Sequence, residues 1–379
     1  MRVAIVSETW PPEINGVALT VHGLASGLRA LGHVVSIVRP RQPDSAGAGC
    51  TDGFATLFVG SGTLPRYPGL RFGIPAPGSL IRHWRAARPD AVYVATEGPL
   101  GHSALNAARR LGIPVCTGFH TRFDDFVRHY GFAWLTPLVF AGMRRFHNRA
   151  DATLVPTAEL AQFLGTHGFR SVRVLRRAVD TAQFHPRWRD AALRAQWGLG
   201  DDALAVLHVG RLAAEKNLDV AVRAFRAIYR SNVDARLVIV GDGPERARLA
   251  AENPDVVFAG VRRGEELSRH YASGDLFLFP STTETFGNVT LEAMASGLPI
   301  VAFDYGAARE HIPGPMAGVR VAFGDNEAFV HQAAALAGSP DRRARMRVQA
   351  RHAVETLSPE AVCAAFADLL ADLAMRRAA

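Results

Sequence analysis

The sequence predicts two doubly wound α/β domains, each with a parallel sheet between two layers of helices. Short apolar runs of strand length alternate with amphipathic runs of helix length through nearly the whole chain, and this alternation starts afresh near the middle. The chain has 379 residues, which exceeds the size at which one hydrophobic core usually keeps growing. We therefore expect one domain at residues 1–185, a second at 186–357 and a terminal helix at 358–379.

The composition is that of an ordinary globular protein, with 48% hydrophobic and 21% charged residues. No apolar run approaches the ~20 residues of a membrane span. The apolar start of the chain is too short for a secretory signal, with Glu8 where its core should continue. The three cysteines, Cys50, Cys116 and Cys363, lack the spacing of metal ligands. We therefore expect a cytoplasmic protein and no metal site.

The net charge is +8, and almost all of the positive charge is arginine. Such a balance favours polyanionic partners, which include phosphates, anionic lipid surfaces and nucleic acids. The charge alone does not choose among these partners. Lys216 is the only lysine in the chain, so surface solubility is a poor explanation for it.

The first elements form a βαβ unit. A buried strand at 2–7, a loop at 8–16, a helix at 17–31 and a strand at 34–38 follow one another. The loop contains Asn15-Gly16 instead of the G-x-G-x-x-G of nicotinamide enzymes, which counts against an oxidoreductase. A turn residue is a sufficient explanation of Gly16 from the sequence alone.

Further along the first half, residues 61–79 are rich in Gly and Pro and predict an ordered surface loop. A strand at 91–95, a helix at 101–111 and a strand at 114–119 follow. Polar residues then come directly after that strand, where open parallel sheets bind ligands. They include His120, Arg122, Asp124 and Tyr130. His120 fits a ligand contact and a helix cap equally well on this basis.

An aromatic and aliphatic run with flanking arginines occupies residues 132–149. We interpret it as a buried core helix with a solvated basic end, although the same pattern suits a helix lying on a lipid surface. A strand at 152–155, a helix ending near 168, a strand at 172–175 and the connection at 176–186 complete this half.

The second half begins with a strand at 204–209 and a helix from about residue 217. Arg211 and Lys216 lie on the turn between them, where two cations and free backbone amides can face one diphosphate. The G-D-G run at 241–243 follows the next strand and is weak evidence for any ligand.

The most informative stretch is 279–299, where a strand ending at Phe279 precedes a helix expected from about Phe286 to Gly297. Free amides of Phe286, Gly287 and Asn288 at the helix start suit a phosphate or a sugar hydroxyl. Glu284 lies in the loop, and Glu292 is the one charge on a largely apolar helix, where a buried carboxylate needs a partner. The alternative is an acid near the helix dipole and a surface glutamate.

The run E-T-F-G-N-V-T-L-E-A-M-A-S-G-L-P, which starts at Glu284, resembles the Glu-x7-Glu signature of retaining nucleotide-sugar glycosyltransferases of the GT-B fold. The resemblance is to glycosyltransferase family four, group 1. It is nearest to bacterial GDP-mannose-dependent alpha-mannosyltransferases and to sulfoquinovosyl and glycosyl-diacylglycerol transferases. It implies two Rossmann-like domains that face a cleft, with the helix at 359–377 crossing back to the first.

The resemblance also implies roles for single residues. Glu284 would contact the donor sugar, Glu292 the ribose hydroxyls, and Arg211 and Lys216 of GRLAAEKNL the pyrophosphate. His120 of FHTRF would face the donor sugar. The implied catalytic residues are His120, Glu284, Arg211 and Lys216. The implied donor-binding residues are Gly16, Arg211, Lys216, Val261, Glu284, Phe286, Gly287, Asn288 and Glu292. Arg122, Asp124 and Tyr130 would lie on the acceptor side.

We therefore predict retaining hexosyl transfer from a nucleotide-diphosphate sugar, best matched by GDP-mannose, to a lipid or glycolipid acceptor. We expect no resident cofactor, no metal and no nucleic-acid partner, with an anionic membrane surface as a further partner at the inner face of the cell membrane. UDP-glucose, UDP-glucuronate and UDP-sulfoquinovose are alternative donors. A nucleotide-sugar epimerase, a glycan phosphorylase and a basic module that binds nucleic acid or membranes are the rival classes.

Overall fold

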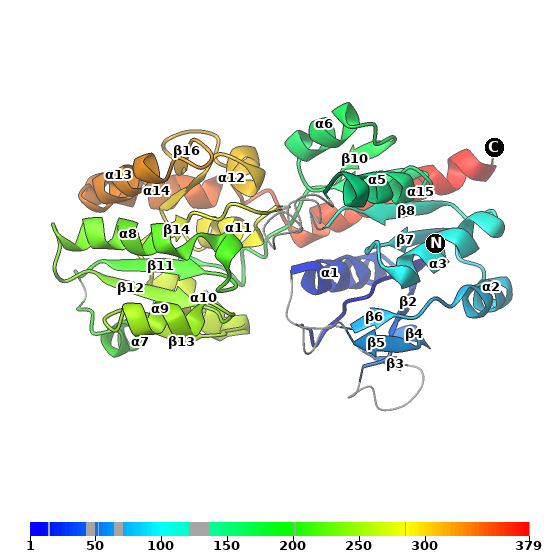
Figure 1. Cartoon of the computed structure of the whole chain (residues 1–379), viewed down its shortest axis with the longest axis horizontal. Helices are drawn as coiled ribbons and strands as arrows, with labels where there is room; N and C mark the ends of the chain where they lie inside the picture. The colour runs from blue at the N-terminus through cyan, green and yellow to red at the C-terminus, as the bar shows by residue number, and fades with distance from the viewer. Residues whose placement is uncertain are drawn as a thin grey trace. The chain divides into compact units, whose positions relative to one another are not determined.

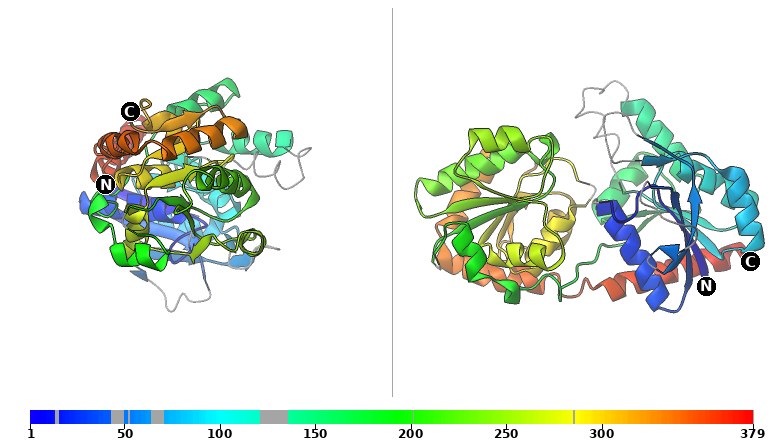
Figure 2. Two further views of the ribbon diagram at one scale, coloured as in Figure 1. Left: turned by 90° about the vertical axis from the view of Figure 1, so that its left-hand side faces the viewer. Right: turned by 90° about the horizontal axis from the view of Figure 1, so that it is seen from below.

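The computed structural model describes residues 1–13, 16–42, 50–51, 53–63, 71–120, 136–200, 202–284 and 286–378. The chain divides into two compact units. Unit 1 comprises Met1–Arg176 and Pro359–Ala379, and unit 2 comprises Arg177–Ser358. In each unit, helices cover both faces of a sheet (Figures 1 and 2). The division after Arg176 lies upstream of the boundary at residue 185 that we drew from the sequence.

Unit 1 is built on a sheet with the described strand order β10-β9-β8-β7-β1-β2-β4-β3. Neighbouring strands run parallel except β3 and β4. The order turns back between β1 and β7, so the carboxyl ends of these two strands form the topological switch point. The strands are β1 Arg2–Val6, β2 Val34–Pro40, β3 Cys50–Thr51, β4 Phe54–Val59, β7 Ala91–Val94, β8 Val115–Gly118, β9 Ala152–Val155 and β10 Val172–Val174.

Two apolar cores flank this sheet. Side chains of α1 and the C-terminal helix α15 fill one core, and those of α2 and α3 fill the other. Phe366 and Leu370 of α15 are buried with the residues of β1 and β7, and α15 runs beside α1 (Figure 2). The helices are α1 Gly16–Ala30, α2 Pro77–Ala86, α3 Pro99–Arg110, α5 Thr136–His147, α6 Ala158–Thr166 and α15 Pro359–Ala378. The predicted return of the last helix to the first domain is therefore confirmed.

Unit 2 has a parallel sheet with the strand order β13-β12-β11-β14-β15-β16 among its described residues. The chain moves outward from β11 to β13, returns to β14 beside β11, and then moves outward on the other side. The switch point therefore lies between β11 and β14. The strands are β11 Ala205–Val209, β12 Arg236–Val240, β13 Val257–Gly260, β14 Leu276–Phe279, β15 Ile300–Phe303 and β16 Val319–Val321.

The helices of unit 2 also divide between the two faces of its sheet. Residues of α8, α9 and α13 share one core, and residues of α10, α11 and α12 share the other. The helices are α7 Ala191–Gln196, α8 Leu218–Tyr229, α9 Arg246–Glu252, α10 Gly264–Ser273, α11 Asn288–Ala295, α12 Gly306–His311, α13 Asn326–Ala337 and α14 Pro340–His352, with 3₁₀ turns η2 Pro186–Trp188 and η3 Ala214–Lys216.

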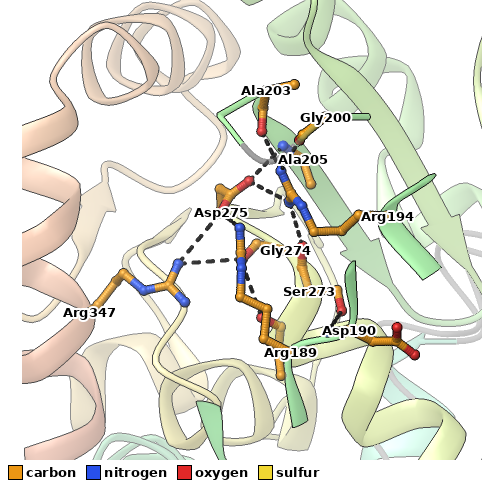
Figure 3. Close-up of polar contacts among 11 residues, drawn as sticks. Arg189, Asp190, Arg194, Gly200, Ala203, Ala205, Ser273, Gly274, Asp275 and Arg347 are labelled. Carbon is orange, nitrogen blue, oxygen red and sulfur yellow. Dashed lines mark hydrogen bonds and ion pairs between the residues drawn. The ribbon is translucent and has the colours of Figure 1, made fainter. Parts of the chain in front are cut away.

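A charged cluster fixes the amino ends of the two central strands of unit 2 (Figure 3). The Asp275 carboxylate, just before β14, accepts the backbone N–H of Ala205 at 2.9 Å. It also pairs with Arg189 and Arg194, both at 2.9 Å, and lies 3.7 Å from Arg347. Arg194 is 2% exposed and also donates from Nη1 and Nη2 to backbone carbonyls, so the charge of this buried cation is compensated.

The structure corrects three local expectations. The segment 61–79 is not simply a loop, because β5 Ser61–Thr63 pairs with β6 Arg71–Gly73 and α2 begins at Pro77. The helix expected from Phe286 begins at Asn288, because Gly287 at φ 93° is its N-cap. Gly16, which we placed in a loop, is the first residue of α1.

Candidate functional site

The switch point of unit 2 brings together the two loops that carry the predicted donor residues. The loop after β11 contains Arg211 and Lys216, and the loop after β14 contains Glu284. Because β11 and β14 are parallel neighbours, both loops leave the same edge of the sheet. This edge is where open α/β sheets bind their ligands.

Lys216 and Glu284 form an ion pair between Nζ and Oε1. Each side chain is 15% exposed. Ser281 Oγ donates to the same Glu284 oxygen at 2.9 Å. Partial burial strengthens the attraction between the two charges relative to a surface pair. The two residues that we predicted to act on the donor are thus brought into direct contact.

The backbones of the two loops are also hydrogen-bonded to each other. The Glu215 carbonyl accepts from the Thr282 N–H at 2.9 Å and from Thr282 Oγ1 at 3.1 Å. On the other side of η3, Asn217 adopts a left-handed conformation at φ 53° before α8 begins. These contacts fix the backbone at Lys216, and its long side chain extends to Glu284.

Arg211 lies at the start of the same loop and is exposed. Two glycines of the G-D-G run support the backbone beside it. A Cβ on Gly241 would lie 1.9 Å from the Gly210 carbonyl oxygen, and a Cβ on Gly243 would lie 2.3 Å from that of Leu212. The weak G-x-G signal therefore has a packing explanation, since these glycines allow the β12–α9 loop to approach the Arg211 loop closely.

Glu292 lies on α11, and its partner is Tyr271 of α10. Tyr271 Oη donates to Glu292 Oε2 at 2.8 Å. Burial raises the pKa of Glu292 to about 6, although the hydrogen bond from Tyr271 acts in the opposite direction. The sequence predicted that this carboxylate needs a partner but did not identify Tyr271, which lies on another helix.

The start of α11 is closely packed. Gly306 has φ 56°, and a Cβ there would lie 2.8 Å from the Phe286 carbonyl oxygen, which accepts from Ala307 N–H at 2.7 Å. Phe286 is 5% exposed and packs edge-on against His311. Val261, one of the predicted donor-binding residues, is 44% exposed directly after β13, the edge strand of the sheet.

His208 on β11 is a polar residue that sequence reasoning missed. It is fully buried, its Nδ1 lies 2.9 Å from the Leu278 carbonyl oxygen, and its Nε2 has no hydrogen-bond partner among the described residues. Burial, with a smaller effect of the Lys216 charge, lowers the pKa of His208 to about 4, so the ring is neutral at pH 7. Its position just before Gly210-Arg211 was the only available signal.

In unit 1, His120 follows β8 and is half-buried. Its Nε2 lies 2.6 Å from Tyr93 Oη of the neighbouring strand β7. Gly16, also predicted in this unit, is exposed at the start of α1. Arg122, Asp124 and Tyr130, predicted on the acceptor side, lie outside the described residues.

A second polar network of unit 1 was not predicted. Thr117 Oγ1 lies 2.8 Å from His147 Nδ1, and His147 Nε2 lies 3.0 Å from Glu97 Oε1. Thr117 and His147 are fully buried, so this network connects α5 to β8 and to the end of β7. Nearby, burial raises the pKa of Glu8, which accepts the backbone N–H of Leu100 at 2.9 Å.

Within the described ranges, no three His, Cys, Asp or Glu side chains gather in a metal-like group. In the same residues, no helix has both the length and the apolar character needed to cross a bilayer. Neither observation bears on the donor or the acceptor.

Two family models match the chain. Residues 14–183 match Glycosyltransferase Family 4, and residues 203–339 match Glycosyl transferases group 1. A GDP-mannose-dependent alpha-mannosyltransferase of Mycobacterium tuberculosis is 36% identical over 96% of this chain and 94% of its own. Sulfoquinovosyl transferase SQD2 of Arabidopsis thaliana is 30% identical over 82% of this chain and 61% of its own.

Solved structures give the same fold. Sucrose-phosphate synthase from Thermosynechococcus elongatus superposes with a TM-score of 0.79 at 19% identity, over 98% of each chain. HepE from Anabaena in complex with UDP has a TM-score of 0.75 at 17% identity, over 98% of this chain and 100% of its own. These likenesses support the two-domain GT-B architecture that the sequence predicted.

Proposed function

Because this chain belongs to the group 1 enzymes of glycosyltransferase family 4, we propose that it transfers mannose from GDP-mannose to a lipid or glycolipid acceptor. It is a glycosyltransferase that uses a nucleotide sugar, so the epimerase and phosphorylase alternatives are set aside. The observation that carries the proposal is the pairing of Lys216 with Glu284 at the switch point of unit 2, beside Arg211 and α11.

The choice of GDP-mannose is supported by relatives. Three GDP-mannose-dependent alpha-mannosyltransferases, from Mycobacterium tuberculosis, Mycolicibacterium smegmatis and Corynebacterium glutamicum, are 36%, 38% and 33% identical to this chain. The lipid acceptor is supported by a GDP-mannose-dependent phosphatidylinositol dimannoside mannosyltransferase that is 30% identical over 93% of its length.

In the proposed reaction the bond between the anomeric carbon and the diphosphate breaks, and a bond from the acceptor oxygen forms on the same face. Because the new bond forms on the face from which the diphosphate leaves, the anomeric configuration is retained. The acceptor hydroxyl gives its proton to the departing phosphate oxygen. Arg211 and Lys216 stabilise the negative charge that develops on the diphosphate, without a metal ion. Glu284 binds the sugar and Glu292 the ribose hydroxyls.

The Lys216–Glu284 pair suits this role because it provides, side by side, a cation for the diphosphate and a carboxylate for sugar hydroxyls. The Lys216 ammonium can turn toward the diphosphate when the nucleotide sugar binds, because its three N–H groups lie at the end of a flexible side chain. The carboxylate remains bound to Ser281 and becomes available to sugar hydroxyls. When the nucleotide sugar binds, the ionic contact between Lys216 and Glu284 is therefore replaced by one between Lys216 and the diphosphate.

A second donor class has specific support. Alpha-monoglucosyldiacylglycerol synthase of Streptococcus pneumoniae is 27% identical over 71% of its length, and the sulfoquinovosyl transferase is 30% identical. Transfer of a different sugar to diacylglycerol is therefore the alternative function, and for it we propose a UDP sugar as the donor.

The test is a transfer assay with purified full-length chain, in excess EDTA. GDP-mannose, UDP-glucose, UDP-glucuronate and UDP-sulfoquinovose are each offered with vesicles that contain diacylglycerol or phosphatidylinositol, and products are identified by mass spectrometry and NMR. Mannosylated lipid with an α-linkage is the expected product. Transfer only from a UDP sugar would establish the alternative, and activity that returns only on adding Mg²⁺ or Mn²⁺ would overturn the metal-independent mechanism.

A further inference from the structure

We propose that Tyr93 is a positioning residue for His120, whose imidazole it holds in one orientation and one tautomer through the hydrogen bond to Nε2. The inference rests on the proposed function, together with the role that the family resemblance implies for His120, which is contact with the donor sugar. No comparison assigns a role to Tyr93.

The two residues belong to neighbouring parallel strands of unit 1. Tyr93 lies on β7, opposite Cys116 of β8, and His120 follows the end of β8. The Oη–Nε2 distance of 2.6 Å is short for a neutral hydrogen bond, and the two rings are nearly perpendicular at 79°. Tyr93 is 1% exposed, and a buried phenol that lost this partner would incur a desolvation cost.

Gly118 leaves the space in which the hydrogen bond forms. A Cβ at this position would lie 2.3 Å from Tyr93 Oη and 2.4 Å from His120 Nε2. Both distances are far below van der Waals contact, so any other residue would push the two groups apart. At the last residue of β8, a side chain larger than hydrogen would therefore collide with the Tyr93–His120 pair.

The returning helix α15 keeps the Tyr93 ring in place. Phe366 is fully buried and contacts Tyr93 edge-on, with ring centroids 5.1 Å apart and planes at 72°. An aromatic ring enclosed between a strand and a helix has little freedom to follow a rotation of its hydrogen-bond partner. The orientation of the His120 ring is therefore set by the fixed Tyr93 ring, which makes Tyr93 the positioning residue.

The bond also selects the tautomer. A phenolic O–H is a stronger acid than a neutral imidazole N–H, so Tyr93 donates and Nε2 accepts. The ring proton then resides on Nδ1, because the hydrogen bond at one ring nitrogen decides which nitrogen is protonated. With Nε2 accepting from Tyr93, Nδ1 is the ring nitrogen that acts as a donor, and an N–H donor suits a sugar hydroxyl oxygen.

The primary test is Tyr93→Phe, which removes the hydroxyl and keeps the ring that packs on Phe366. We expect kcat for transfer to fall about tenfold, which is the typical effect of losing one hydrogen bond that orients a reacting group. KM for the nucleotide sugar should change little. Tyr229→Phe on α8, where the tyrosine is 38% exposed, is the matched control and should leave both constants unchanged. Gly118→Ala should reproduce the fall by forcing the pair apart.

Dependence on His120 is measured in a double-mutant cycle. Adding Tyr93→Phe to His120→Ala should have no further effect on kcat, since the residue to be positioned is gone. If Tyr93→Phe lowers kcat equally with and without His120, it acts through general stability and the proposal is overturned.

A readout independent of activity is the ¹⁵N NMR spectrum of protein labelled at histidine, with His120→Ala used for assignment. In the native chain Nε2 of His120 should give the signal of an unprotonated nitrogen, and in Tyr93→Phe the signal of mixed tautomers. Unchanged ring signals would overturn the proposal. A change in these signals with no kinetic effect of either His120→Ala or Tyr93→Phe would instead contradict the role of His120 in the proposed function.

Discussion

Lys216 and Glu284, 68 positions apart in the sequence, meet in an ion pair that joins the loops after β11 and β14. This contact satisfies both charges while the side chains are only 15% exposed. A donor diphosphate that binds there must therefore attract Lys216 more strongly than Glu284 does. Arg211, which is exposed on the same loop, adds the second positive charge for that competition.

Replacing Lys216 or Arg211 with Ala should lower turnover about 100-fold or more, because one group that stabilises a developing anion contributes ~3 kcal/mol. The measurement is kcat/KM for transfer, with circular dichroism to verify the fold. Arg223→Ala is the matched control, since that arginine lies on α8 and forms an exposed pair with Glu327. Turnover like that of the native enzyme in either active-site variant would remove the diphosphate role from that residue.

The raised pKa of Glu292 predicts a pH-dependent stability. A carboxyl whose folded pKa of about 6 exceeds the ordinary 4.5 contributes stability that is fully present below pH 4.5 and is lost as the pH rises through 6. The shift corresponds to ~2 kcal/mol. Between pH 4 and pH 7.5, the native chain should therefore lose ~2 kcal/mol more unfolding free energy than Glu292→Gln, which cannot ionise.

Urea unfolding of both proteins at the two pH values measures this difference, and Glu355→Gln in the exposed turn after α14 serves as the control. Parallel stability profiles of the native chain and Glu292→Gln would show that Glu292 is not a carboxyl with a perturbed pKa. The same result would weaken its assignment as the buried ligand of the ribose.

Asp275→Asn should destabilise unit 2 by ~3 kcal/mol, because it leaves the buried Arg194 guanidinium without its carboxylate. The urea midpoint at pH 7 measures the loss. Glu327→Gln breaks an exposed pair in which the carboxylate is 81% exposed, and it should change stability by less than ~0.5 kcal/mol. Equal effects of the two substitutions would mean that Asp275 adds little beyond a surface contact.

The sequence was informative where chemistry is encoded locally. Strand and helix periodicity predicted both sheets, and the spacing of Arg211 and Lys216 on one turn predicted the loop after β11. Contacts that depend on strand order were not predictable in this way. Tyr271, the partner of Glu292, and Tyr93, the partner of His120, lie on separate elements, so only the fold shows which buried polar group is nearest.

The interpretation of residues 132–149 as a buried core helix is only partly right for the portion that the structure describes. On α5, Met143, Phe146 and His147 are buried and Arg144 and Arg145 are exposed, as a core helix with a solvated basic end requires, but Leu138 is 71% exposed. The exposed face therefore combines an apolar side chain with two cations, as expected of a helix that contacts an anionic bilayer.

If the acceptor is a membrane lipid, the enzyme should bind anionic vesicles reversibly, with an affinity that falls as salt is added. Each arginine near the bilayer contributes ~1 kcal/mol within a Debye length, so Arg144→Ser with Arg145→Ser should weaken vesicle binding about 30-fold at low salt. Arg149 is left in place, since it bonds to Asn106. Arg82→Ser with Arg85→Ser on α2 removes the same charge from another exposed helix and should leave vesicle binding nearly unchanged. Nucleotide-sugar binding should be unaffected in both. Equal weakening by the two pairs would assign the attraction to net charge, and transfer to a soluble sugar with no vesicle binding would contradict the lipid acceptor itself.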